Sequence, residues 1–410
     1  ASRLALSQLD AKLYDGSVSG SAQLNIATRQ AKATSRINFS LHNVFDLLTP
    51  KVQRWLKQYQ CSEAPVVTGT ARVTLPEWTN SEPDWRAEVR PTLMLKGQVT
   101  SGPVTFRGVE VESVRSDLVY SNLTLRLPNL VAKRPEGEVR LALRSHTETQ
   151  DFHIDFRSSI DPHAITPAFE EEKQKKGFDY FSFNTSPVIE GQVWGRWRER
   201  EQTGFRAFLA ATNFTFRAQQ VDGFTAGISF ANGFLNMTNA VVRRPEGRAS
   251  VDALGFDTRT RRLYLTNAVG RLEPTAVAKA IGPKTASSLE PYRFLEPPLA
   301  SVNGWVKTGP GRNPADLRFV IDGGVLHYSK FNSRDIDGEI LWRGQTLTLT
   351  NIVAEFYGGE LRGNLVSRFK EDRSADLAFH LDTKQTELSD FMSDILGKKS
   401  GLKGRLDGSL

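Results

Sequence analysis

The side chains that could carry out chemistry are few in this chain of 410 residues, and their spacing matches no common catalytic or metal-binding pattern. Cys61 is the only cysteine, so neither an intrachain disulfide nor a thiolate metal site can form. The six histidines are scattered, and the motifs G-x-S-x-G, H-E-x-x-H and G-x-x-x-x-G-K-[ST] are absent. We therefore expect a protein that is not an enzyme and that holds no metal and no cofactor.

Apolar residues at every second position are the more informative pattern. They occur in the segments INFSL, FHIDF, LYL and LAFHL, and such spacing places them on one face of a β-strand. The composition agrees, because 24 Phe and 32 Gly against only 3 Met favour a β-rich chain with many turns. The sequence therefore favours a protein that binds an apolar ligand.

Two glycine-containing phrases recur along the chain. The first reads YDGS, RPEGE, RPEGR and YGGE, and its glycines Gly16, Gly137, Gly247 and Gly359 are 121, 110 and 112 residues apart. The second phrase is an apolar run before a glycine, and its separations are 122, 113 and 100 residues, at Gly69, Gly191, Gly304 and Gly404. Two markers with one period indicate a tandem repeat.

The elements between these markers also keep their order. A hairpin-like pair is followed by a strand that leads into the turn phrase, by two further strands, and by a short helical segment. We expect the turn glycines to adopt positive φ, and we interpret Asp222–Gly223 and Asp337–Gly338 as similar turns. The helices are predicted from a capping residue before proline at Thr49, Asp161 and Glu273, and from helical spacing in TELSDFMSDIL.

The predicted fold is therefore mainly β, an elongated repeating β-groove of antiparallel sheets with about five or six strands per unit and a short helix between units. Residues 1–60 form the second half of a unit plus its helix, and 401–410 start a further unit. Between them lie three β-groove units at residues 61–181, 182–298 and 299–400. The incomplete ends suggest a piece of a longer array.

Each unit must bury its apolar strand face, either in a closed two-layer core or in a groove shared by successive units. One short helix per unit is too little to cover a sheet, which favours the groove. The expected lining residues are Ile37, Phe39, Leu41, Leu123, Leu125, Ile154, Phe156, Phe214, Phe216, Ile228, Phe230, Leu263, Leu265, Leu317, Phe319, Ile321, Leu347, Leu349, Leu377, Phe379 and Leu381.

The phrase FYGGELRGNL, followed by AFHLDT, ELSDFMSDIL and GLKGRLDGSL, resembles the AsmA/TamB-like proteins of Gram-negative envelopes. This likeness is clearest over residues 315–410 and weaker in the earlier units, where KRPEG and RRPEG replace the aromatic residue by charge. It implies a bridge-like lipid-transfer protein of the periplasm, anchored in the inner membrane in its full-length form. The continuous hydrophobic groove of such a protein carries phospholipid acyl chains and supports outer-membrane homeostasis.

Several alternatives stay open at this point. The chain could be a scaffold or chaperone for outer-membrane protein assembly, with envelope proteins as partners, or an extracellular β-sandwich stalk or adhesin. The net charge of +7 suits an anionic partner, but basic residues near the turns are also typical of a solvated sheet edge. We expect no nucleic-acid binding, and membrane association only through segments outside this chain, since no apolar run approaches about 20 residues.

Overall fold

The computed structural model describes residues 2–14, 16–169, 172–290, 292–308, 314–328, 330–370 and 374–410. The chain is mainly β, with one large antiparallel sheet of 25 strands, a few short helices and a separate sheet of three short strands, β4, β7 and β8. This confirms the predicted fold class. It also argues against two equal packed sheets per unit, since the second sheet among the described residues is so small.

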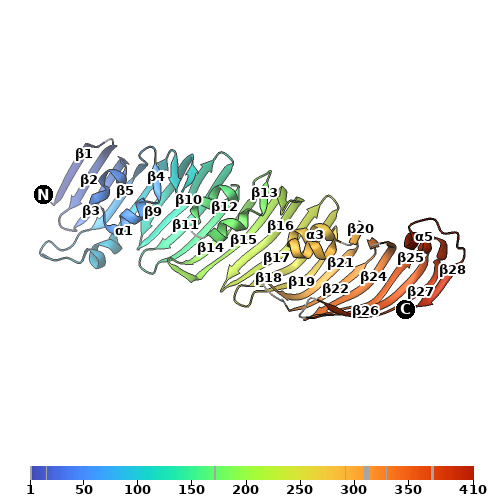
Figure 1. The fold of residues 1–410 in the computed structure, drawn as a ribbon. Coiled ribbons are helices and arrows are strands. Elements are labelled where there is room, and N and C mark those ends of the chain that lie inside the picture. Colours follow the sequence, from blue (N-terminus) through green and yellow to red (C-terminus); the bar gives the residue numbers. More distant parts are fainter. Residues whose placement is uncertain are drawn as a thin grey trace. The chain divides into compact units, whose positions relative to one another are not determined.

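The chain divides into two compact units, which we describe separately. Unit 1 comprises Ala1–Asp179 and Thr185–Phe208, and unit 2 comprises Tyr180–Asn184 and Leu209–Leu410. The long strand β15 (Glu199–Phe216) contributes its first part to unit 1 and its last part to unit 2. Within each unit, neighbouring strands lie side by side (Figure 1).

Unit 1 holds thirteen further strands and six helical segments among its described residues. The strands are β1 (Arg3–Leu13), β2 (Gly16–Asn25), β3 (Gln30–Asn38), β4 (Tyr59–Cys61), β5 (Val66–Thr74), β6 (Met94–Ser101), β7 (Val104–Phe106), β8 (Val109–Val111), β9 (Ser113–Ser121), β10 (Thr124–Arg134), β11 (Gly137–His146), β12 (Asp151–Ser158) and β14 (Val188–Arg196). The helical segments are η1 (Leu41–Leu47), α1 (Pro50–Leu56), η2 (Trp85–Val89), η3 (Arg90–Thr92), η4 (Pro162–Ala168) and α2 (Glu172–Phe178).

Unit 2 is built in the same way. Its strands are β13 (Phe181–Phe183), β16 (Gln219–Ala231), β17 (Phe234–Arg244), β18 (Gly247–Asp257), β19 (Arg262–Arg271), β20 (Tyr292–Glu296), β21 (Leu299–Lys307), β22 (Ala315–Asp322), β23 (Val325–Tyr328), β24 (Phe331–Arg343), β25 (Thr346–Phe356), β26 (Gly359–Phe369), β27 (Ala375–Glu387) and β28 (Arg405–Ser409). Its helices are α3 (Pro274–Ile281), α4 (Pro283–Leu289) and α5 (Leu388–Leu396).

The strand pairing repeats between helical segments. In unit 1, the strands β5, β6, β9, β10, β11 and β12 pair in that order between α1 and η4. In unit 2, the strands β21, β22, β24, β25, β26 and β27 do the same between α4 and α5. Six neighbouring described strands per repeat agree with the predicted five or six.

A short strand after the helical segment also repeats, at β4, β13 and β20. Each pairs with a strand of the following hairpin and places one aromatic ring against another. The ring centroids of these pairs are 4.8–4.9 Å apart, in Tyr59–Phe106, Phe181–Phe216 and Tyr292–Tyr328. These ring pairs join the short strand after each helical segment to the hairpin strand with which it pairs.

The predicted helix starts are largely confirmed. The carboxylates of Asp161 and Glu273 accept hydrogen bonds from backbone N–H groups in the first turns of η4 and α3, with a proline at the start of each segment. Thr49 precedes α1, but its side chain makes no capping hydrogen bond. The segment that begins at Asp161 is a 3-10 helix rather than an α-helix.

The turn glycines occupy one structural position in all four repeats, but not for the expected reason. Gly16, Gly137, Gly247 and Gly359 are the first residues of β2, β11, β18 and β26, and none has positive φ. A Cβ atom there would lie only 2.0–2.4 Å from a backbone carbonyl oxygen of the neighbouring chain segment. Close backbone approach therefore requires glycine. The predicted turns at Gly223 and Gly338 are wrong, because both residues lie inside strands.

Candidate functional site

The apolar face of unit 2 is defined by its strand register. Directly opposed residues of antiparallel strands share a face of the sheet. Leu349 on β25 is opposed to Ile340 on β24 and to Leu365 on β26, and the row continues to Phe379 on β27. In the other direction it passes from Ile340 to Phe319 on β22. One apolar row thus crosses five neighbouring strands.

A parallel row extends this face toward the start of unit 2. Leu317 is opposed to Gly304, which is opposed to Leu265, and the row continues through Leu254 and Met237 to Ile228. The strand alternation read from sequence therefore places residues from six strands on a single surface.

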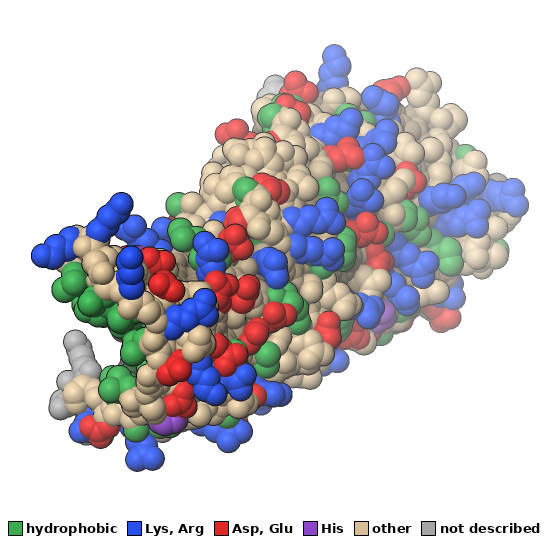
Figure 2. Space-filling model, turned by 90° about the vertical axis from the view of Figure 1, so that its right-hand side faces the viewer, with side chains coloured by type: hydrophobic (Ala, Val, Ile, Leu, Met, Phe, Trp, Pro, Cys, Tyr) green, Lys and Arg blue, Asp and Glu red, His purple; other side chains and the backbone are tan. Residues whose placement is uncertain are grey.

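A hollow of about 680 Å³ lies on this face, within the range of about 300–1,000 Å³ typical of ligand pockets. Most of its lining residues are apolar; two acidic residues, Asp337 and Glu339, belong to the lining, and lysine and arginine are absent from it among the described residues. Three predicted lining residues, Ile321, Leu349 and Leu381, belong to it. Figure 2 shows hydrophobic side chains inside a hollow of this end of the molecule, with charged side chains over the outer surface.

The other predicted residues of unit 2 lie at different depths. Leu317 is buried, whereas Leu377 and Phe379 are 63% and 48% exposed on the inner face, as expected for side chains at an open rim. Phe214 and Phe216 differ from the expectation. They pack with Phe181 and Phe183 of β13 in a closed aromatic cluster instead of lining an open surface.

Unit 1 carries a comparable apolar face. Leu125 is opposed to Tyr120 on β9, and the row continues through Leu95 and Ala71 to Ala33 on β3. Ala33 and Ala71 line a second apolar hollow of about 350 Å³. The predicted residues Ile37, Ile154 and Phe156 occupy the same face by strand alternation and register.

Three predicted lining residues of unit 1 are misplaced by sequence reasoning. The strand β3 ends at Asn38, so Phe39 lies beyond it and Leu41 starts the 3-10 helix η1, where its side chain is 43% exposed. Leu123 lies in the turn before β10 with a φ of 58°. The alternation of apolar residues in the sequence continues past the ends of the strands. The backbone there forms a turn or a helix, so alternation no longer determines which face a side chain occupies.

The turn phrases of the middle repeats hold ion pairs where the last repeat has aromatic residues. Arg134 and Arg244 bond Glu136 and Glu246 two residues later, and both guanidinium side chains are largely buried, with 14% and 12% exposed. The corresponding residue three positions before the last turn glycine is Phe356, which lines the 680 Å³ hollow. Pairing lets the two arginines lie beside an apolar face.

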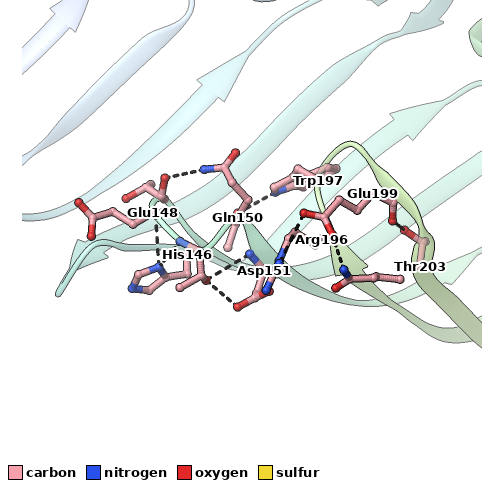
Figure 3. Close-up of polar contacts among 12 residues, drawn as sticks. His146, Glu148, Gln150, Asp151, Arg196, Trp197, Glu199 and Thr203 are labelled. Carbon is pink, nitrogen blue, oxygen red and sulfur yellow. Dashed lines mark hydrogen bonds and ion pairs between the residues drawn. The ribbon is translucent and has the colours of Figure 1, made fainter.

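A polar network ties two turns of unit 1 together (Figure 3). Arg196 bonds both Asp151 and Glu199, and Trp197 donates to the hydroxyl of Ser145 at 2.8 Å. Hydrogen bonds from Thr149 and then Arg196 lower the pKa of the Asp151 carboxyl, and that carboxylate in turn raises the pKa of Arg196. These groups are exposed and paired with one another. The network therefore holds the two turns together at the surface and is not a reactive centre.

Known proteins supply no further constraint on this site. No family model, no curated protein and no solved structure matches the chain. Within the described part of the chain, no three His, Cys, Asp or Glu side chains gather as a metal site, and no helix is long and apolar enough to cross a membrane. The apolar faces are therefore the features that a function must explain.

Sequence reasoning overlooked a repeated asparagine that shapes these faces. Asn129, Asn239 and Asn351 each stand eight residues before a turn glycine, at points where the strand register shifts. Asn239 and Asn351 have φ near 50°, a conformation that asparagine tolerates better than most residues. The backbone N–H of Asn351 donates to the side chain of Asn364 at 3.0 Å. Such bulges bend and twist strands. The common spacing was the available signal.

Proposed function

We propose that this protein binds lipid acyl chains on its apolar sheet faces and transfers phospholipid along them between membranes. The observation that carries the proposal is the open hollow of about 680 Å³ in unit 2, lined by apolar side chains from successive strands. An open hollow lined by apolar side chains is the usual form of a site that binds an apolar ligand.

The dimensions of the hollow suit a single acyl chain. Its lining includes residues of β23 and α5 and of six neighbouring strands, β22, β24, β25, β26, β27 and β28, and six strands at about 4.8 Å spacing span about 24 Å. An acyl chain reaches across half of a hydrocarbon core of about 30 Å, hence about 15 Å. Each methylene removed from water contributes about 0.8 kcal/mol, so ten methylenes supply about 8 kcal/mol, which corresponds to a micromolar dissociation constant.

The chemistry of the lining suits transfer better than storage. Lysine and arginine are missing from the described lining, so a charged headgroup is most stable outside in water. Rows of similar apolar residues on neighbouring strands offer many equivalent positions and no single deep site. An acyl chain held in this way can shift from one strand to the next at little cost.

The cellular setting follows from the sequence resemblance to AsmA/TamB-like proteins. It suggests the periplasm of a Gram-negative cell, with an inner-membrane anchor supplied by segments outside this chain and outer-membrane homeostasis as the purpose. The charged outer surface is compatible with an aqueous compartment.

Photo-crosslinking tests the proposal directly. A phospholipid with a diazirine on one acyl chain is incubated with the purified protein, irradiated, and located by peptide mass spectrometry. We expect crosslinks on inner-face residues such as Ile340, Leu349 and Leu361, together with co-purified phospholipid in native mass spectra. Crosslinks confined to outer-face residues, or protein that consistently takes up no lipid, would refute the proposal.

A further inference from the structure

We propose that helix α5 is a hinged lid at one side of the unit 2 hollow, and that lifting it admits and releases the lipid. The inference rests on the proposed function and adds its regulation. Phe391 of α5 lines the hollow and packs against Phe331, Phe356 and Tyr357, with ring centroids 5.7–6.1 Å away. The helix contacts β24 and β27. It lies at the ends of the strands of this repeat (Figure 1).

The two ends of α5 are held differently. Its first residue follows β27 directly, and there the backbone N–H of Leu388 donates to the carbonyl of Gly404 at 3.0 Å. At its last turn, the backbone N–H of Ser400 donates to the hydroxyl of Ser393 at 2.8 Å, and three side chains of other elements bond the helix. The hydroxyl of Tyr357 donates to Asp394 at 2.6 Å, Asn332 donates to the same carboxylate at 3.0 Å, and Lys330 donates to the carbonyl of Ile395 at 2.8 Å. We call the Leu388 end of the helix the hinge. The hydrogen bonds from Tyr357, Asn332 and Lys330 to its last turn are called the latch.

The lid is weakly held compared with the sheet beneath it. No side chain of α5 is fully buried, and a nine-residue helix has little stability of its own. Its last residue is followed by Gly397 in the left-handed conformation, with φ of 67°. Segments with few buried contacts open without global unfolding. The strands below are paired along most of their length by ladders interrupted only at bulges, so α5 can move while they stay paired.

The two middle repeats lack the hydroxyl of this latch. Tyr357 stands two residues before the last turn glycine, as Tyr14 does before Gly16, whereas Pro135 and Pro245 occupy this position in the middle repeats. Phe356 likewise replaces Arg134 and Arg244. The last repeat has YGG where the middle repeats have RPEG. It is also the repeat in which α5 is held at the unit 2 hollow.

Two measurements test the lid, the rates at which a fatty-acid probe binds and dissociates and the hydrogen exchange of the α5 amides. The probe is 11-(dansylamino)undecanoic acid, and the variant Asp394→Ala removes the acceptor of two latch bonds. Asp390→Ala is the matched control, since it removes the same charge from an exposed site on the same helix. We expect Asp394→Ala to raise both the association and dissociation rates of the probe about tenfold, with little change in affinity, and to speed exchange of α5 amides by a similar factor.

The outcomes separate the lid from the proposed function. Unchanged probe rates in Asp394→Ala, or α5 amides that exchange no faster than those of β25 in the unmodified protein, overturn the lid. A loss of affinity without faster rates does so as well, because it indicates a merely structural contact. If the unmodified protein binds no probe, the proposed function fails, whereas amide exchange still decides whether α5 opens apart from the strands.

Discussion

A single charge placed in the middle of the unit 2 hollow should abolish most acyl-chain binding. Leu349 lies on β25 with its side chain in the hollow, and it is flanked by Ile340 and Leu365 on the adjacent strands. Leu349→Lys would put an ammonium group among apolar side chains, where a lipid chain can no longer pass without desolvating it. The preceding residue, Thr348, is opposed to Leu341 and Val366 on the other face of the same strand. Thr348→Lys is therefore the matched control.

The expected magnitude follows from the geometry. Leu349 stands near the middle of the strands that line the hollow, so an acyl chain would be confined to about half of its former length. Loss of contact for about five methylenes at about 0.8 kcal/mol each amounts to about 4 kcal/mol, which is roughly a thousandfold in the dissociation constant. Fluorescence titration with 11-(dansylamino)undecanoic acid measures this change, and circular dichroism confirms that both variants keep their strands. Equal weakening by Thr348→Lys, or unaltered binding by Leu349→Lys, would refute the reasoning.

The remaining predictions concern the turn phrase and the bulge of the last repeat. Gly359→Ala should destabilise the protein by about 2–3 kcal/mol, because a Cβ would lie 2.4 Å from a backbone carbonyl oxygen. Gly358→Ala, with open space around a φ of 69°, should cost only about 1 kcal/mol. Asn351→Val should cost about 1–2 kcal/mol, since its φ of 54° disfavours a branched side chain, whereas Asn351→Gly should be nearly neutral. Burial and the nearby Asp394 carboxylate raise the pKa of Tyr357 to about 12, so its neutral form is favoured in the folded state. The stability linked to this group is complete below about pH 10 and is lost as the pH rises from about 10 to about 12.

Urea unfolding measures all three predictions. Equal effects of the two glycine variants would contradict the close-approach explanation, and an unaltered midpoint in Asn351→Val would contradict the role of the bulge. For the tyrosine, the comparison is between the native protein and Tyr357→Phe at pH 9 and pH 11. The native protein should lose more stability over this interval, and parallel losses would show that Tyr357 is not the group responsible.

The repeat frame was accessible from sequence because it rests on local rules. Alternating apolar residues predict strands wherever one face is buried, and helix starts at Asp161 and Glu273 follow from proline and a capping carboxylate. The same local rules failed at chain reversals. Leu41 and Leu123 continue an alternating pattern beyond a strand end, and only the backbone path reveals that they have left it.

The lining of the hollow could be predicted only in part. Ile321, Leu349 and Leu381 were found because strand alternation alone places them on the inner face. Phe214 met the same criterion but is buried, because β13 pairs beside β15 and packs Phe181 and Phe183 against it, and that contact joins segments about thirty residues apart. Phe391 was assigned to a helical face without any hint that this face enters the hollow.

The sequence by itself determined that the chain repeats, that it is built mainly of strands, and which residues of each strand share a face, since these properties depend on spacing along the chain. Only the tertiary structure decided which part of that face stays open, which part is covered by β13 or α5, and why the turn glycines are required. Such features depend on the distance between segments remote in sequence. The spacing of residues along the chain cannot reveal that a Cβ atom at Gly359 would lie 2.4 Å from a backbone carbonyl oxygen.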